Sequence, residues 1–252
     1  MKVLESTKGF KSFYQDKGVV LEYDKKRLKT ARQRILRELE RTLPLKFIKQ
    51  GSNILEIGCG TGFVTNYLLK KGTVTAVDSS EEMLKKCKAT IKAASVNAPI
   101  KFVKSSLFEF YSTKKFQYVV SIRVMLHLKK SDLTKASATI SESMKKEGLF
   151  MFDVESKSFF KKFFMAVRWT YTKKEVINPQ YSKNDLKTAI SKKFEIIKII
   201  PYDHAVLILP FYLIAEVSHS EKLENIISKM EKTLSWLPIL NTRWFVVCKK
   251  LQ

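Results

Sequence analysis

The stretch Ile54-Leu55-Glu56-Ile57-Gly58-Cys59-Gly60-Thr61-Gly62-Phe63 places three glycines directly after a short apolar run. An amphipathic segment follows, so the pattern predicts a strand, a glycine-rich turn and then a helix. Glycine permits positive φ values, and its lack of a side chain lets a ligand approach the backbone closely. The first turn of the following helix would present unpaired N–H groups. The stretch therefore predicts a ligand-binding loop.

The glycine spacing narrows the choice of ligand. It reads Gly-x-Gly-x-Gly, and Phe63 stands where the dinucleotide fingerprint has its third glycine. Glu56 precedes the first glycine by two residues. With that acid, the stretch resembles the nucleotide-binding motif of class I S-adenosylmethionine (SAM)-dependent methyltransferases. The resemblance implies an enzyme of the EC 2.1.1 type that uses SAM, releases S-adenosylhomocysteine and needs no metal. The alternative is a tight strand–helix turn in another α/β protein.

A second motif follows at the end of the next predicted strand, Thr73–Asp78. Asp78 lies 20 residues after Gly58, where an acid can accept hydrogen bonds from both hydroxyls of a ribose. The alternative makes Asp78 the N-cap of the next helix. The stretch Ala76-Val77-Asp78-Ser79-Ser80-Glu81-Glu82-Met83-Leu84 resembles the second motif of the family. That resemblance implies that Asp78 holds the ribose and that Met83 lies near the adenine.

Strands and helices alternate along the chain. A helix is expected from about Ser131 to Lys146, with Gly148 as its C-terminal cap. The alternation predicts a parallel sheet with helices on both faces. The resemblance implies a Rossmann-like, seven-stranded, mostly parallel sheet with an antiparallel last strand and helical lid insertions. The later strands are predicted at Ile100–Lys104, Phe116–Ile122, Leu149–Val154, Phe194–Ile200 and Arg243–Cys248.

The cofactor site is expected at the carboxyl ends of these strands. Ser106 stands where members of the family often carry an acid that receives the adenine amino group, and the Leu107 N–H is the other candidate for this contact. Near the N-terminus, the resemblance implies that Tyr23 and Arg27 close over the methionine portion, with ordinary helix packing as the alternative. The predicted cofactor-binding residues are Tyr23, Arg27, Glu56, Gly58, Gly60, Gly62, Asp78, Ser79, Met83, Ser106, Leu107 and Arg123.

Catalysis needs a general base only if the acceptor holds its proton at neutral pH. His127, just past the fourth predicted strand, is the best-placed candidate, and a purely structural histidine is the alternative. Asp153 and Glu155 are weaker candidates. Enzymes that methylate exocyclic or amide nitrogens often carry Asn/Asp-Pro-Pro-Tyr/Phe after the fourth strand, and this chain does not. The similar stretch Asn178-Pro179-Gln180-Tyr181 is interpreted as a turn leading to a helix and as a false match.

The composition of the chain limits the number of domains, the cellular compartment and the class of partner. The chain has 252 residues, of which 45% are hydrophobic, so we expect one folded domain. The polar N-terminus and the lack of a disulfide or metal-ligand spacing suggest a cytoplasmic protein, with a peripheral membrane location as an alternative. The net charge of +23 raises the prospect of an anionic partner such as RNA, DNA or an anionic membrane. The lysines are scattered in pairs, however, which is typical of a solvated surface.

The segments around the core should decide the substrate. Residues 22–43 are expected to form one basic amphipathic helix, with an apolar stripe made of Leu28, Ala31, Ile35, Leu39 and Leu43. Residues 158–169 are crowded with aromatic and basic residues, as in a substrate lid or a membrane interface. The apolar run 205–215 is too short to span a bilayer and is interrupted by Pro210. We therefore expect an N-terminal helical cap (1–48), a SAM-binding core (49–155) and two lid or substrate insertions (156–185 and 203–241).

These features favour a methyltransferase that acts on a small or lipid-like acceptor with an apolar portion. Two alternatives stay open. One is an RNA methyltransferase that uses the basic surface, and the other is a non-catalytic SAM-binding partner subunit.

Overall fold

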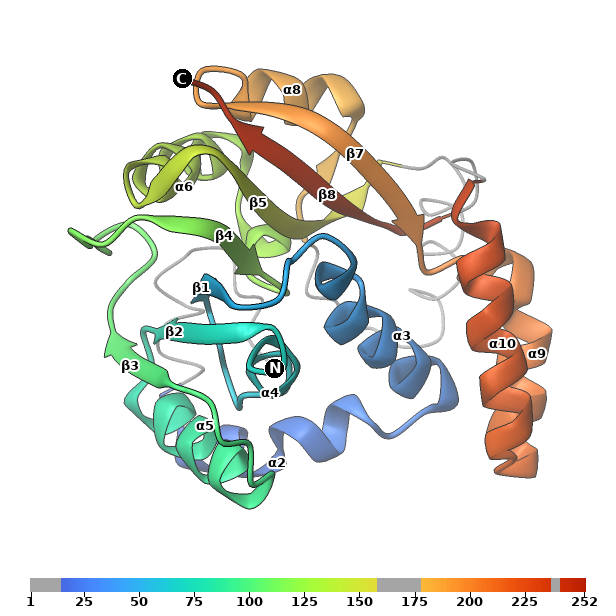
Figure 1. Cartoon of the computed structure of the whole chain (residues 1–252). Coiled ribbons are helices and arrows are strands. Elements are labelled where there is room, and N and C mark those ends of the chain that lie inside the picture. The colour runs from blue at the N-terminus through green and yellow to red at the C-terminus, as the bar shows by residue number, and fades with distance from the viewer. Residues whose placement is uncertain (1–14, 158–177, 237–240) are drawn as a thin grey trace.

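The computed structural model describes residues 15–157, 178–236 and 241–252 (Figure 1). One mixed sheet forms the centre of this fold, and most of its strands are rich in β-branched and aromatic residues, which favour extended backbone. In chain order the strands are β1 (Ser52–Ile57), β2 (Gly72–Asp78), β3 (Ile100–Lys104), β4 (Phe116–Ser121), β5 (Met144–Ser156), β6 (Gln180–Tyr181), β7 (Phe194–Tyr202) and β8 (Arg243–Lys250).

The strand order is β3-β2-β1-β4-β5-β8-β7, with the short β6 paired to β5. All pairings are parallel except those of β8, which runs antiparallel to both β5 and β7. The order reverses between β1 and β4, and ligands in such sheets bind in the crevice beyond this switch point. The predicted fold class, a Rossmann-like sheet with an antiparallel last strand, is confirmed. The eighth strand, β6, is an addition to the seven that were expected.

Helices cover both faces of the sheet (Figure 1). One face packs against α3, α4 and α5 through a core that includes Leu39, Leu68 and Cys87. The other face packs against α6 and α8 through Leu133 and Leu186. The helices are α2 (Lys17–Arg27), α3 (Ala31–Thr42), α4 (Thr65–Leu68), α5 (Glu81–Ala93), α6 (Lys130–Glu142), α8 (Lys183–Ile190), α9 (Ala205–Ser218) and α10 (Glu221–Thr233), with short 3-10 turns η1 (Pro44–Lys46), η2 (Met125–His127) and η3 (Leu234–Trp236).

The single helix predicted over residues 22–43 is wrong, because the chain forms α2 and α3 instead. Thr30 begins α3 with a capping box in which its hydroxyl accepts from the Gln33 N–H and the Gln33 side chain accepts from the Thr30 N–H. These bonds satisfy N–H groups at a new helix start and so favour the break. Leu28, which was expected in the apolar stripe, is consequently exposed.

Two boundaries after β4 also differ from the predictions. α6 ends at Glu142, so Gly148 is not its cap and lies inside β5. The register between β4 and β5 shifts at this point, and Glu147 has a φ of 61°. Residues 144–146, which were predicted as the end of the helix, therefore belong to the bulged start of β5.

α9 and α10 form a hairpin beside α3 at one edge of the molecule (Figure 1). α9 continues through Pro210, which was expected to interrupt the apolar run. Pro210 is exposed and removes a single backbone donor, so the helix tolerates it. Among the described helices, none is both long and apolar enough to cross a membrane. The aromatic and basic segment 158–169 and residues 237–240 lie outside the described residues.

Candidate functional site

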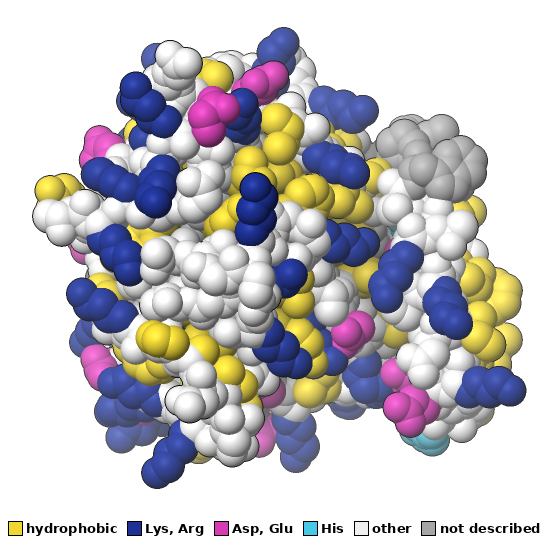
Figure 2. Space-filling view, in the orientation of Figure 1, with side chains coloured by type: hydrophobic (Ala, Val, Ile, Leu, Met, Phe, Trp, Pro, Cys, Tyr) yellow, Lys and Arg dark blue, Asp and Glu magenta, His cyan; other side chains and the backbone are white. Residues whose placement is uncertain are grey.

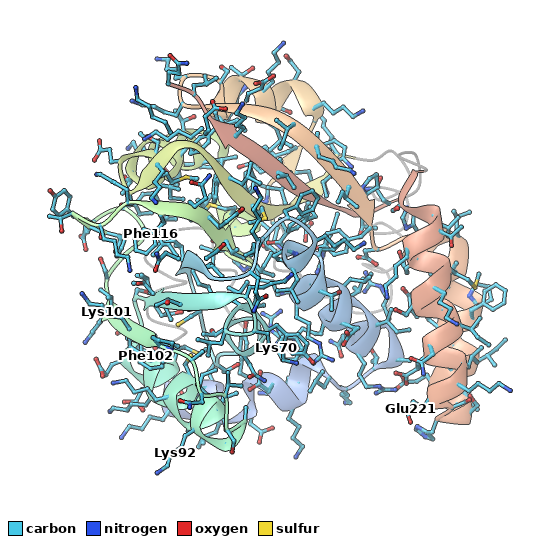
Figure 3. The ribbon with its side chains drawn as sticks, in the orientation of Figure 1. Lys70, Lys92, Lys101, Phe102, Phe116 and Glu221 are labelled. Carbon is cyan, nitrogen blue, oxygen red and sulfur yellow. The ribbon has the colours of Figure 1, made fainter. Side chains whose placement is uncertain are left out.

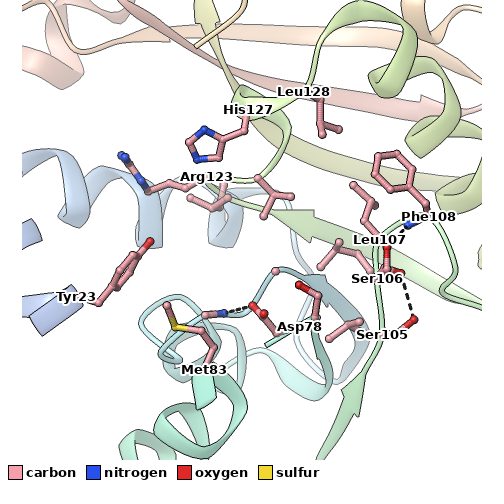
Figure 4. Close-up of a pocket in the computed structure, with 17 residues that line it drawn as sticks. Tyr23, Asp78, Met83, Ser105, Ser106, Leu107, Phe108, Arg123, His127 and Leu128 are labelled. Atoms are coloured by element: carbon pink, nitrogen blue, oxygen red, sulfur yellow. Dashed lines mark hydrogen bonds between the residues drawn. The ribbon is translucent and has the colours of Figure 1, made fainter. Parts of the chain in front are cut away.

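A pocket of about 310 Å³ opens at the switch point, at the carboxyl ends of β1, β2 and β4 (Figure 4). Its volume falls in the range of small-molecule sites. Of the twelve predicted cofactor residues and the best-placed candidate base, ten line this pocket, namely Tyr23, Gly58, Gly60, Asp78, Ser79, Met83, Ser106, Leu107, Arg123 and His127, whereas the weaker candidates Asp153 and Glu155 do not.

The glycine-rich loop after β1 forms one wall of the pocket. Gly58 packs so closely on the segment after β4 that an added Cβ would lie 2.2 Å from Val124 Cγ2. Gly60 has a φ of 53°, and no protein atom lies within 4 Å of the position that its Cβ would take. The open side of Gly60 faces space that a ligand could fill. The helix after the loop, α4, has only four residues, shorter than the sequence pattern suggested.

Asp78 connects the end of β2 to this loop. Its Oδ2 accepts from the Gly60 N–H at 2.9 Å, and its Oδ1 accepts from the Ser80 N–H at 2.9 Å. Burial raises the pKa of the Asp78 carboxyl, although these two hydrogen bonds oppose the rise. Each carboxylate oxygen has a second lone pair, so both can also accept from a ligand hydroxyl. The N-cap of α5 is Ser80, so the alternative assignment of Asp78 as that cap is wrong.

Three of the predicted cofactor residues do not belong to the pocket wall. Glu56 lies beneath the loop in β1 with 3% of its surface exposed, and burial raises the pKa of its carboxyl well above the usual value. Gly62 packs on Cys87. The Arg27 guanidinium lies 4.5 Å from the centre of the Tyr23 ring, so it contacts the pocket through that ring. Their roles in binding stay predictions.

Arg123 lies just past β4 and carries an unusual backbone conformation, with a φ of 63°. Two acids hold it there. The Arg123 N–H donates to Asp153 Oδ1 at 2.5 Å, and the guanidinium donates to Glu40 Oε1 at 2.9 Å. Strained backbone of this kind persists only where its surroundings fix it, and it is common at functional sites.

Glu40 is buried on α3 and joins distant parts of the chain, since Arg243 on β8 also donates to its Oε1, at 2.8 Å. Burial raises the pKa of Glu40, but Arg123, Arg243 and Arg37 lower it more, and the carboxyl stays ionised. The pKa of the neighbouring Asp153 is raised to about 6, first by burial and then by the charge of Glu40. The network ties the pocket to both α3 and β8.

His127 lies in η2 and is held by a chain of polar side chains. Its Nδ1 is 2.8 Å from Asn178 Oδ1, and Asn178 Nδ2 donates to Glu155 Oε1 at 2.8 Å. A carboxylate can only accept, so the amide NH₂ of Asn178 must face Glu155 and its oxygen must face His127. His127 therefore carries its proton on Nδ1, and Nε2 is an acceptor. Burial and nearby arginines lower the pKa of His127 to about 4, so the ring is neutral at physiological pH.

Residues 178–181 lead to a helix, α8, as predicted, but they include a short strand where a turn was expected. Gln180 and Tyr181 form β6 beside β5, and the buried Tyr181 hydroxyl donates to the Leu128 carbonyl. α8 begins with a capping box, in which the Ser182 hydroxyl accepts from the Asp185 N–H three residues later. The pairing of β6 with β5 is what brings Asn178 to the histidine.

Several other contacts at the site have no signal in the residue pattern. Asp24 on α2 accepts from the Thr61 hydroxyl at 2.8 Å and so fastens this helix to the glycine-rich loop. Among the described residues, no three His, Cys, Asp or Glu side chains cluster as they would around a metal ion. The pocket residues that were not predicted are Ile57, Val77, Ser105, Phe108, Ile122, Val124 and Leu128, most of them next to predicted positions at strand ends.

Comparison with known proteins agrees with this architecture. Residues 54–148 match the family described as "Methyltransferase domain". A "Putative methyltransferase" of Geobacillus sp. (strain WCH70) is 36% identical over 112 residues, which are 43% of this chain and 44% of that protein. The match thus spans less than half the length of the relative.

Two solved structures share the fold at low sequence identity. Magnesium protoporphyrin IX methyltransferase (ChlM) from Synechocystis PCC 6803, solved with bound SAH, has a TM-score of 0.69 at 10% identity and covers 97% of this chain and 99% of its own. The cyclopropane synthase MmaA2 from Mycobacterium tuberculosis has a TM-score of 0.60 at 13% identity, with 84% of each chain covered. At such identities the likeness shows the fold alone.

Proposed function

We propose that this chain, whose core is a class I methyltransferase domain, binds SAM in the pocket beyond β1, β2 and β4 and transfers its methyl group to a small or lipid-like acceptor. One observation carries the proposal. The hydrogen bond from the Gly60 N–H to Asp78 Oδ2 holds the open glycine loop and the acid at the end of β2 together at the switch point. A backbone that a nucleoside can approach and a carboxylate that can accept from its ribose thus share one pocket.

The residues present suit this cofactor. Asp78 would accept from the ribose hydroxyls, Met83 and Leu107 would enclose the adenine, and Gly58 and Gly60 would allow close approach to the backbone. When bound, SAM supplies an electrophilic methyl group on a sulfonium. The task of the protein is then to orient the acceptor and to exclude water from it.

The acceptor is expected to have an apolar portion, because much of the pocket wall is apolar. Besides Leu107, which is assigned to the adenine, these side chains are Phe108, Ile122, Val124 and Leu128. The two structural neighbours named above are a magnesium protoporphyrin IX methyltransferase and a cyclopropane synthase, which supports a small-molecule or lipid-like acceptor.

His127 is the proposed general base. Its Nδ1–H is committed to Asn178, so the basic atom is Nε2. Because the ring is neutral at pH 7, it can take a proton without first losing one. The low pKa of His127 makes it a weak base. Such a base suits an acceptor atom that becomes positively charged, and so loses its proton easily, only while its new bond to the methyl carbon forms.

Calorimetric titration with SAM tests the cofactor. Asp78→Ala should weaken binding at least about tenfold, because a ribose loses its acceptor. Glu142→Ala removes an exposed acid at the end of α6 and is the matched control, expected to bind as the wild type does. Equal affinity in both variants would contradict the assignment of Asp78.

A screen with radiolabelled SAM and the purified chain tests the acceptor. Lipids, quinones and small aromatic acids are expected to take up label, whereas structured and single-stranded RNA should not. If only RNA takes up label, the alternative of an RNA methyltransferase that uses its basic surface is favoured. SAM binding without turnover on any acceptor would favour a non-catalytic partner subunit. In the structure, Lys70, Lys92 and Lys101 project from separate elements (Figure 3), which does not suggest one RNA-binding stripe.

A further inference from the structure

One side of α9 is apolar and exposed. The opposite side packs in a small core with α3 and α10 through Ile208, Tyr212 and Ala215. Monomeric proteins seldom expose a contiguous row of large apolar side chains unless that row binds something. The α9 face, as we call the row, consists of Leu207, Phe211, Leu213, Ile214 and Val217, of which Val217 is 84%, Leu213 59% and Ile214 56% exposed.

Three of the four acids of this hairpin are paired with other groups of the protein. Glu216, the only charged residue of α9, accepts from the Ala31 N–H at 2.5 Å. Glu224 pairs with Arg34 at 2.5 Å. Glu231 is buried against His204 at 2.7 Å. Each of these three carboxylates is therefore matched by a donor of the protein, and Glu216 alone of the three keeps a sizeable exposed part, 37% of its side chain.

The lysines of α10 are, in contrast, exposed. They are Lys222, Lys229 and Lys232, and they form a basic rim. Ile226, itself 46% exposed, lies one helical turn from both Lys222 and Lys229 and extends the apolar surface onto α10. Glu221 is an exposed acid at the far tip of α10 (Figure 3). In Figure 2, basic side chains over α10 border hydrophobic ones at the edge of the molecule.

We propose that the α9 face and its basic rim dock on the surface of a bilayer that contains anionic lipids. Apolar side chains beside lysines match the boundary between acyl chains and anionic headgroups. Charge decides against a second copy of this chain as the occupant, because two molecules with a net charge of +23 repel each other. The proposal is independent of the methyl acceptor, since a peripheral enzyme can act on a soluble or a membrane-dissolved molecule.

Cosedimentation with lipid vesicles tests this docking. The wild-type chain should bind vesicles of mixed phosphatidylglycerol and phosphatidylcholine at physiological ionic strength, and bind pure phosphatidylcholine much less. The double variant Ile214→Asp/Val217→Asp should lower the partition coefficient at least about tenfold, because two inserting side chains become charged. Both positions are exposed, so thermal unfolding should show that the fold is kept.

Tyr111→Asp is the matched control, because Tyr111 is 73% exposed and follows β3 at the opposite end of the sheet. Its binding should stay within about twofold of the wild type. The proposal is overturned if the double variant binds as well as the control, since net charge alone would then explain binding. It is also overturned if the wild type does not bind anionic vesicles. If, in that case, the wild type is a dimer and the double variant is a monomer, the α9 face is an interface between two copies of the chain.

Discussion

Replacing Gly60 by alanine separates the cost of an unusual backbone from the cost of a blocked pocket. Gly60 has a φ of 53° and lines the pocket, and its added Cβ would contact no protein atom within 4 Å. Gly51, in the loop before β1, has a φ of 74° and equally open surroundings, but does not line the pocket. Gly51→Ala is therefore a matched control for the backbone effect.

The effect on stability should be similar in the two variants. A left-handed conformation costs an alanine about 1–2 kcal/mol, and the smaller entropy of the unfolded chain offsets about 0.4–1 kcal/mol of this. A net loss of about 1 kcal/mol lowers the melting temperature of a chain of this size by roughly 2–4 °C. Both variants should show this modest shift, since neither Cβ clashes with the protein.

The effect on SAM affinity should differ. The new methyl group of Gly60→Ala occupies space at the proposed contact with the nucleoside. Overpacking by one methyl group costs about 1–3 kcal/mol, which weakens binding by roughly 5–150-fold. Gly51→Ala should bind SAM as tightly as the wild type. Calorimetry and thermal melts on the three proteins measure both quantities, and equal SAM affinity in the two variants would refute the close approach of the cofactor to Gly60.

Three further predictions concern the surroundings of the pocket. Glu40→Leu should reduce the free energy of unfolding in urea by about 3–5 kcal/mol, because Arg123 and Arg243 lose a buried carboxylate. His127 has a pKa of about 4 in the fold and about 6.5 when unfolded. Between these values the unfolded chain binds the extra proton at His127, so this residue alone should lower stability by up to about 1.4 kcal/mol per pH unit on acidification. Asp153, whose pKa the fold raises to about 6, acts in the opposite direction, so the test is the difference in slope between the wild type and His127→Gln. Thr30→Ala should cost about 1 kcal/mol in thermal melts through loss of the capping box.

Much of the fold could be predicted because its signals are local. The strand Ile100–Lys104 has the bounds that its residue pattern predicted. The break between α2 and α3 also had a local signal, since Thr30 and Gln33 stand at the spacing of a capping box. The apolar residues keep their helical spacing across the break, and this pattern led to the prediction of a single helix. Only the packing in the structure shows that Leu28 does not join the core.

The parts of the site that could not be predicted depend on contacts between distant residues. Asn178 reaches His127 across 51 positions, and Asp24 reaches Thr61 across 37. Each contact depends on where a loop or helix lies relative to the sheet. The spacing of apolar residues in the sequence predicts helices and strands, but it does not predict that placement. Residues at strand ends, such as Asp78, were predictable because the topology of a parallel sheet brings those ends together.

The buried charges around Arg123 show how this fold fixes a residue at its switch point. Arg123 has a φ of 63° that a side chain disfavours, so it needs anchors. Asp153 on β5 holds its backbone and Glu40 on α3 holds its guanidinium. Because Glu40 also binds Arg243 on β8, α3 cannot move from the sheet without unpairing two buried arginines. α3 in turn packs against α9, so the helix that carries the proposed membrane face is joined through it to the wall of the pocket.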